Sequence, residues 1–144
     1  MPSPSGATLH HIGCVVDSIE NRIESYGVAL GSVSASRIFE DPIQRSRVAF
    51  LNLPSPGAVQ LELVEPAASD SPVARFLEKG GGLHHLCYEV DDLQEQIRWM
   101  KSQRAVLIRS PKPAVAFGGR HIAWMRTRDA LLIEYLERRL SGSG

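Results

Sequence analysis

The stretch Leu9-His-His-Ile-Gly-Cys-Val-Val-Asp17 decides how the chain is organised, because a close copy returns as Leu83-His-His-Leu-Cys-Tyr-Glu-Val-Asp91. The second histidines of the two copies, His11 and His85, lie 74 positions apart (85 − 11). A supersecondary unit that repeats in this way usually buries its open face against the other copy. The repeat therefore predicts two similar modules in one chain.

Each copy also leads to a strand-like run with a glutamate at its centre. The first run is Val59-Gln-Leu-Glu-Leu-Val-Glu65 and the second is Leu131-Leu-Ile-Glu-Tyr-Leu-Glu137. Their central residues, Glu62 and Glu134, lie 72 positions apart (134 − 62), close to the offset of the histidines. The two copies thus stay in near register from their first strand to their last.

Composition narrows the classes of function. The chain has 144 residues, 43% of them hydrophobic, which is enough for one domain with a packed interior. Lys and Arg number 16, and so do Asp and Glu, which removes the usual electrostatic reason to expect nucleic acid or an anionic membrane as the partner. No apolar run approaches the roughly 20 residues of a membrane span, and the first eight residues do not resemble a signal peptide. We expect a cytoplasmic protein whose two cysteines, Cys14 and Cys87, are free thiols.

Turn residues and periodicity predict an α+β fold. In the first copy we expect a strand, a helix that ends at Gly31, and three further strands, at residues 9–16, 19–30, 32–40, 45–53 and 59–65. In the second copy we expect the same order: a strand at residues 83–90, a helix that carries Leu93, Ile97 and Met100, and strands at 105–109, 120–127 and 130–137, with a loop over residues 111–119. The predicted organisation is a βαβββ module at 7–66, a linker with a short helix at 67–82 and a second βαβββ module at 83–139, together one structural domain.

Strand alternation suggests which histidine of each pair matters. Residues two apart in a strand share a face, so Ile12, Cys14 and Val16 form an apolar face that can pack on the helix. His11 and, by the same argument, His85 lie on the other face. We expect His10 and His84 to face away from it.

The recurring histidines and glutamates together indicate a metal site. Glu62 and Glu134 sit among apolar neighbours, where an uncompensated carboxylate is costly. Two imidazoles and two carboxylates suit a divalent ion such as Zn, Co, Ni, Fe or Mn, with positions left for water or substrate. The sequence therefore predicts that His11, Glu62, His85 and Glu134 bind one metal ion.

These sequence segments resemble those of the vicinal oxygen chelate superfamily, which has the glyoxalase and bleomycin-resistance fold. The resemblance is greatest to its methylmalonyl-CoA epimerase branch. The matching segments are residues 9–13, 60–66, 76–85, 88–92 and 132–135, within a resemblance that covers about residues 8–138. It implies two βαβββ modules with a cupped mixed sheet around a metal site, the same four ligands, and a homodimer.

The resemblance also implies an activity and raises a difficulty for it. In the epimerase the metal chelates substrate oxygens and stabilises an enolate after the α proton leaves. The family's candidate base is a glutamate on the third strand, and the alignment puts Ala49 there. Glu134 is then the remaining acid-base candidate at a family position.

Further residues are candidates for substrate binding: Arg45, Arg47, Gln60, Cys87, Lys112, Arg120 and His121. Arg45 and Arg47 share the Ala49 face by alternation. An arginine there either binds a substrate carboxylate or phosphate through two parallel hydrogen bonds or lies at the surface and faces solvent. The loop that contains Gly118 and Gly119 corresponds to the family's glycine loop. Its basic residues either meet an acyl-CoA phosphate or form the polar surface of a connection.

The leading hypothesis is a metal-dependent isomerase or epimerase that stabilises an enolate of an acyl-CoA-like or 2-oxo acid substrate. A lyase of the glyoxalase type and a biosynthetic tailoring isomerase or cyclase need the same ligands and stay open. A small-molecule binding or resistance protein is the non-enzymatic alternative. Retention of all four ligands argues against it.

Overall fold

The computed structural model describes residues 3–4, 6–32, 34–54 and 57–138. The chain divides into two compact units, residues 11–84 and residues 1–10 with 85–144. None of the helices in the described residues is long and apolar enough to cross a membrane.

The first module has the expected βαβββ order. Its elements are β1 (Thr8–Val15), α1 (Ile19–Leu30), β2 (Phe39–Asp41), β3 (Ser46–Asn52) and β4 (Gln60–Pro66). Its strands lie in the order β2-β3-β4-β1, with β1 parallel to β4 and the other pairs antiparallel. The predicted α+β class and the first βαβββ unit are confirmed.

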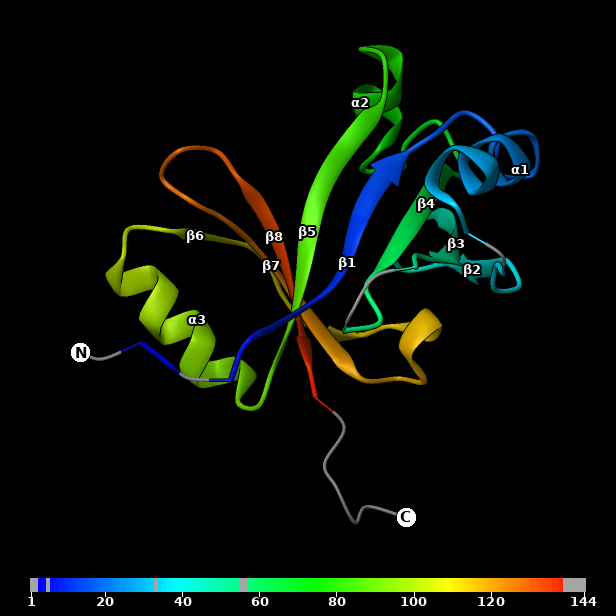
Figure 1. The fold of residues 1–144 in the computed structure, drawn as a ribbon. Coiled ribbons are helices and arrows are strands. Elements are labelled where there is room, and N and C mark those ends of the chain that lie inside the picture. The colour runs from blue at the N-terminus through cyan, green and yellow to red at the C-terminus, as the bar shows by residue number, and fades with distance from the viewer. Residues whose placement is uncertain (1–2, 5, 33, 55–56, 139–144) are drawn as a thin grey trace. The chain divides into compact units, whose positions relative to one another are not determined.

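Local signals begin and end α1 where the sequence predicts. The Ser18 side chain accepts a hydrogen bond from the Asn21 N–H (3.3 Å) at the start, and Gly31 takes a left-handed conformation (φ 70°) at the end. Ile19 on this helix packs in one core cluster with Cys14 and Leu63 of the sheet. The helix contacts β3 and β4, and Figure 1 shows it beside these strands. The apolar face of β1 thus packs against α1, as predicted.

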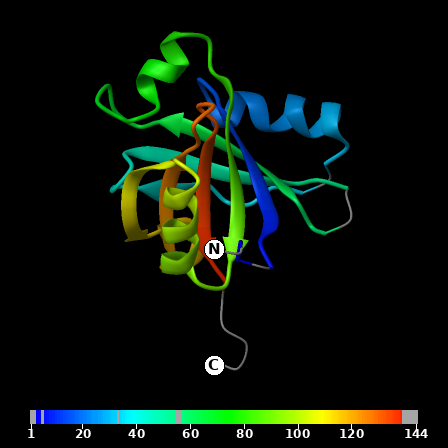
Figure 2. The same ribbon diagram turned by 90° about the vertical axis from the view of Figure 1, so that its left-hand side faces the viewer.

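The second module repeats this arrangement. After the short α2 (Ala74–Glu78) come β5 (Gly82–Val90), α3 (Leu93–Ser102), β6 (Val106–Pro113), the 3₁₀ helix η1 (Val115–Phe117), β7 (His121–Arg126) and β8 (Leu132–Glu137). The strand order is β5-β8-β7-β6, again with one parallel pair, β5 and β8. Helix α3 covers β6, β7 and β8 (Figure 2), and Ile97 and Met100 pack on Met125 and Ile133.

The strand predicted at residues 32–40 is shorter than expected. Among the residues of this stretch that the structure describes, strand pairing is limited to β2 and an isolated bridge between Ala35 and Leu51. Between them the Ser36 hydroxyl accepts a hydrogen bond from the Phe50 N–H (2.9 Å), so a side chain replaces a backbone carbonyl and interrupts the ladder.

The loop predicted at residues 111–119 starts later than expected. Strand β6 continues to Pro113, which lies opposite His121 of β7. Its prolines are tolerated because β6 is the last strand in the order of this module.

Candidate metal centre

In the first module, strand pairing brings one histidine beside one glutamate. The parallel register of β1 and β4 sets His11 opposite Gln60 and Gly13 opposite Glu62. His11 Nε2 and Glu62 Oε1 are 3.4 Å apart. His11 is fully buried and Glu62 is 6% exposed. We call the side of the sheet that carries this pair the histidine face of the first module.

An aromatic ring completes this half. Phe50 of β3 lies directly opposite Glu62 of β4, and its ring meets the His11 ring edge-on with centroids 5.5 Å apart. Such a contact fixes the imidazole plane and shields the pair from water. The histidine is therefore held in place from two strands.

The second module builds the same arrangement from equivalent residues. His85 Nε2 of β5 lies 3.6 Å from Glu134 Oε1 of β8, and both residues are buried. Trp124 of β7 lies opposite Glu134, and its ring meets that of His85 edge-on at 4.7 Å. Each module thus carries a buried histidine, a buried glutamate and an aromatic ring against the histidine. Each pair offers one nitrogen and one carboxylate oxygen to a divalent cation.

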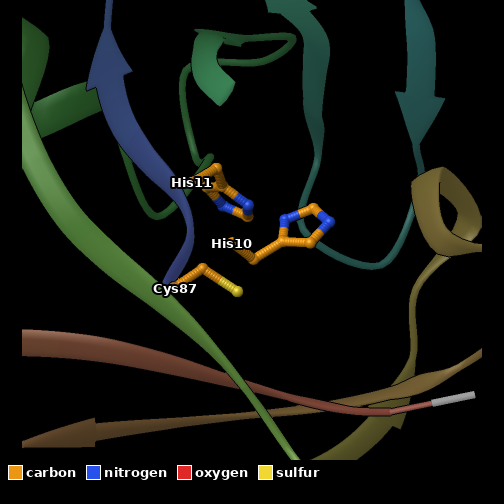
Figure 3. Close-up of side chains that lie close together, drawn as sticks. All are labelled: His10, His11 and Cys87. Atoms are coloured by element: carbon orange, nitrogen blue, oxygen red, sulfur yellow. The ribbon is translucent and has the colours of Figure 1, made fainter. Parts of the chain in front are cut away.

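His10 and His84, the first histidine of each His-His pair, have different surroundings. His84 packs its ring edge-on against Phe76 (4.8 Å). His10 packs against Phe117 (5.4 Å), but a ligand nitrogen of His10 also lies within 4.8 Å of one from His11 on the same strand, and Figure 3 shows the two rings next to each other. The two rings are therefore not kept apart as the alternation of a strand predicts.

The third strand presents different side chains to the histidine face than the alignment suggested. Ala49 belongs to the core cluster against α1, on the other side of the sheet. Because Phe50 contacts His11, the strand neighbour that shares its face is Val48. Neither Val48 nor Phe50 can accept a proton. That no side chain of this strand serves as the base stays a prediction.

The two arginines proposed on this strand are engaged elsewhere. Arg47 Nη2 lies 2.6 Å from Glu20 Oε1, and its Nη1 lies 2.8 Å from Glu65 Oε2. The hydrogen bonds that Arg47 donates to Glu20 and, next in size, to Glu65 raise the pKa of its guanidinium well above its ordinary range. Arg45 is paired with Asp70. These contacts lie on the α1 side and in the turn after β4, so the structure does not bring either arginine to the histidine face.

Gln60 does lie on the histidine face, where its side-chain amide donates to Asn52 Oδ1 (2.7 Å). Both cysteines are buried thiols that are not joined in a disulfide, as predicted. Burial raises the pKa of the Cys14 thiol. Cys87 lies opposite Glu134 in the register of β5 and β8 and is fully buried.

The basic residues near the glycine loop are mostly occupied within the second module. Arg120 Nη1 lies 3.0 Å from Glu89 Oε2 and also donates to the Glu137 carbonyl (3.3 Å). His121 Nδ1 lies 3.4 Å from a carboxylate oxygen of Glu137. Lys112 is exposed on β6. Strand alternation places Glu89 on the His85 face, but its ion pair with Arg120 was not predicted from the sequence.

Duplicated βαβββ modules, each with a buried histidine and glutamate on one face of a mixed sheet, define a class of protein. A family model matches residues 10–124, and the chain belongs to this family, the glyoxalase/bleomycin resistance protein/dioxygenase superfamily.

Similar proteins are known by sequence and by structure. The ethylmalonyl-CoA/methylmalonyl-CoA epimerase of Cereibacter sphaeroides is 32% identical over 124 residues, which are 84% of this chain and 89% of that protein. A hypothetical protein from Bacillus halodurans has a TM-score of 0.82 at 28% identity and matches 97% of this chain and 100% of its own. Methylmalonyl-CoA epimerase from Mycobacterium tuberculosis has a TM-score of 0.79 at 29% identity, over 92% of this chain and 88% of its own.

Proposed function

We propose that this protein is a metal-dependent epimerase that exchanges the proton on the carbon beside a thioester carbonyl of an acyl-CoA. The observation that carries the proposal is the buried histidine–glutamate pair in each module, 3.4 Å and 3.6 Å between the nearest atoms. The similarity to ethylmalonyl-CoA/methylmalonyl-CoA epimerase supports this choice of substrate class.

In this proposal His11, Glu62, His85 and Glu134 together hold one divalent ion, of Zn, Co, Ni, Fe or Mn. The residues fit such an ion because all four are buried and offer two nitrogens and two carboxylate oxygens. Two carboxylates in an apolar setting also need a compensating positive charge. A bound ion would act as a Lewis acid toward oxygens of the substrate and so acidify the neighbouring carbon.

In this proposal a side chain of the protein transfers the proton. Glu134 is the carboxylate that we propose for it, because Val48 and Phe50 occupy the face of β3 that looks toward His11 and Glu62. With no proton acceptor on that face of β3, Glu134 would remove the α proton, and epimerisation requires that a proton exchanged with solvent return to the opposite face of the planar enolate. Ring contacts from Phe50 and Trp124 hold the two imidazoles in fixed orientations.

Metal content and proton exchange test the proposal together. Protein purified without added metal should contain a divalent ion by elemental analysis, and methylmalonyl-CoA incubated with it in deuterated water should gain deuterium at the α carbon. Chelation should stop the exchange. No exchange at high enzyme concentration would reject the epimerase.

A matched pair of variants tests the ligands. His85→Ala should lower metal affinity by more than about tenfold. His84→Ala, which changes the neighbouring histidine that packs on Phe76, should leave the metal content unchanged. Equal metal content in both variants would remove His85 from the ligand set.

The apolar third strand also supports a second candidate. A glyoxalase-type lyase or a tailoring isomerase could use the same ligands with one carboxylate, and assay of the glutathione adduct of methylglyoxal separates the lyase from the epimerase. A binding or resistance protein would retain ligand but show neither activity. We further propose that the protein is a cytoplasmic homodimer.

A further inference from the structure

An aromatic wall runs along the histidine face of the first module. It begins at His11, continues to Phe50 with ring centroids 5.5 Å apart, and reaches Phe39 of β2 with centroids 6.4 Å apart. Phe39 lies opposite Val48 in the antiparallel register, so the three apolar side chains share one face. The wall leads from the proposed metal ligand to the outer strand of the module.

A guanidinium lies at the outer end of this wall. The Arg37 Cζ atom sits 4.1 Å from the centre of the Phe39 ring, a cation–π contact, and the residue is exposed. Within the described parts of the chain, no carboxylate lies within ion-pairing distance of Arg37. Arg47, two residues before Ala49 on the adjacent strand, contrasts with it because two glutamates neutralise that side chain.

The backbone beside Arg37 is anchored to β3. The Ser36 N–H donates to the Phe50 carbonyl (2.8 Å), and the Phe50 N–H donates back to the Ser36 hydroxyl (2.9 Å). The same hydroxyl donates to the Arg37 carbonyl (2.7 Å). The backbone at Arg37 is therefore held in place next to Phe50, the residue whose ring contacts His11.

We infer that Arg37 is a specificity-determining residue that binds an anionic oxygen group of the thioester ligand, a phosphate or a carboxylate. This inference rests on the proposed function for the identity of the ligand. A guanidinium is planar and presents paired N–H donors that match the oxygens of such a group. The Phe39 ring covers one face of the Arg37 guanidinium, so the N–H donors at its edges can still bind the anion. Stacking on Phe39 orders the side chain beforehand and so lowers the entropy lost on binding.

Binding measurements test the inference without requiring turnover. If Arg37 binds a phosphate, propionyl-CoA, which carries phosphates but no free carboxylate, should bind Arg37→Ala at least about tenfold more weakly than the original protein, since a hydrogen-bonded charge pair of this kind is worth tenfold or more. Arg37→Lys keeps the positive charge but lacks the paired N–H donors of the guanidinium. Its affinity should lie between those of the original protein and Arg37→Ala. Phe39→Leu removes the ring under the guanidinium and should weaken binding by a smaller factor.

Ligands that lack one anionic group identify the source of the anion. S-propionyl-pantetheine has neither phosphate nor carboxylate, and its affinity should be the same for the original protein and Arg37→Ala. Methylmalonyl-pantetheine restores only the carboxylate. A loss on Arg37→Ala with propionyl-CoA assigns a phosphate, and a loss with methylmalonyl-pantetheine alone assigns the carboxylate.

Arg22→Ala serves as the control, because Arg22 is an exposed arginine on α1 that is paired with Asp17. It should bind every ligand as the original protein does, and all variants should unfold at similar temperatures. Equal affinity of Arg37→Ala and the original protein for all three thioesters would overturn the inference, even if proton exchange supports the epimerase. A dependence of thioester binding on Arg37 in a protein that exchanges no proton would support the inference and reject the proposed function.

Discussion

Replacing Arg47 by methionine should destabilise the fold without weakening ligand binding. Arg47 bridges Glu20 and Glu65, and the second carboxylate oxygen of Glu65 accepts a hydrogen bond from the Ile19 N–H (2.9 Å) at the start of α1. The Glu65 side chain is only 13% exposed. Without Arg47, this carboxylate keeps its partly buried position but loses its cation.

The size of the effect follows from this burial. Fully exposed ion pairs contribute about 0.2–1 kcal/mol and hydrogen bonds to buried charged groups about 1.5–3 kcal/mol. The Arg47–Glu65 pair, with side chains 26% and 13% exposed, lies between these cases, so we expect a coupling of about 1–2 kcal/mol. In a chain of this size that corresponds to a fall of about 3–6 °C in Tm.

A double-mutant cycle measures the coupling directly. Arg47→Met, Glu65→Gln and the double variant are compared by urea unfolding at pH 7, and the glutamine retains an oxygen for the Ile19 N–H. Arg22→Met, which breaks an exposed pair with Asp17, should change stability by less than about 0.5 kcal/mol. A coupling below about 0.3 kcal/mol, or a tenfold loss of propionyl-CoA affinity in Arg47→Met at unchanged stability, would refute the reasoning.

Three further changes test the fold. Gly81→Ala should cost about 1–3 kcal/mol in urea unfolding, because its φ is 67° and a Cβ would lie 2.7 Å from the Val15 carbonyl oxygen; a neutral result would contradict this close approach. Leu63→Ala should cost about 3–5 kcal/mol, since Leu63 is fully buried against α1, and a loss below 1 kcal/mol would mean that the core there can collapse. The hydrogen bond from Arg47 lowers the pKa of Glu20 below its ordinary value of 4.5, so this carboxylate stabilises the fold above that pH and the benefit disappears as the pH falls through the lowered value. Glu20→Gln should therefore flatten the loss of stability between pH 5 and 3 measured by unfolding, and an unchanged slope would exclude this pair as its source.

Much of the fold could be predicted because its signals are local. Ser18 and Gly31 delimit α1, and Asp92 caps α3 by accepting a hydrogen bond from the Glu95 N–H. The strand at residues 32–40 was overpredicted because its residues suit a strand, while the hydroxyl of Ser36 competes for the backbone partner that would have continued the ladder. This competition depends on a contact between Ser36 and β3, and the strand propensity of the individual residues does not include such contacts.

The histidine pairs could be anticipated for a related reason. His11 and Glu62 recur as His85 and Glu134 at nearly constant spacing, and the structure places each histidine beside its glutamate. Their role as ligands of one ion remains a prediction. The positions of Arg47, Arg120 and Arg37 could not be anticipated, since a long side chain pairs with whichever carboxylate or ring the neighbouring strand supplies.

The sequence by itself determined the duplication, the βαβββ order of each module and the two histidine–glutamate pairs on its first and last strands. Only the tertiary structure decided which face of β3 meets them, because the pairing of Phe50 with Glu62 fixes that face and a shift of one residue would reverse every side chain. It turned Ala49 and Arg47 toward α1 and placed Val48 and Phe50 on the histidine face. The register between strands is set by packing on the helix and by side-chain partners far away in the chain, which no local pattern contains.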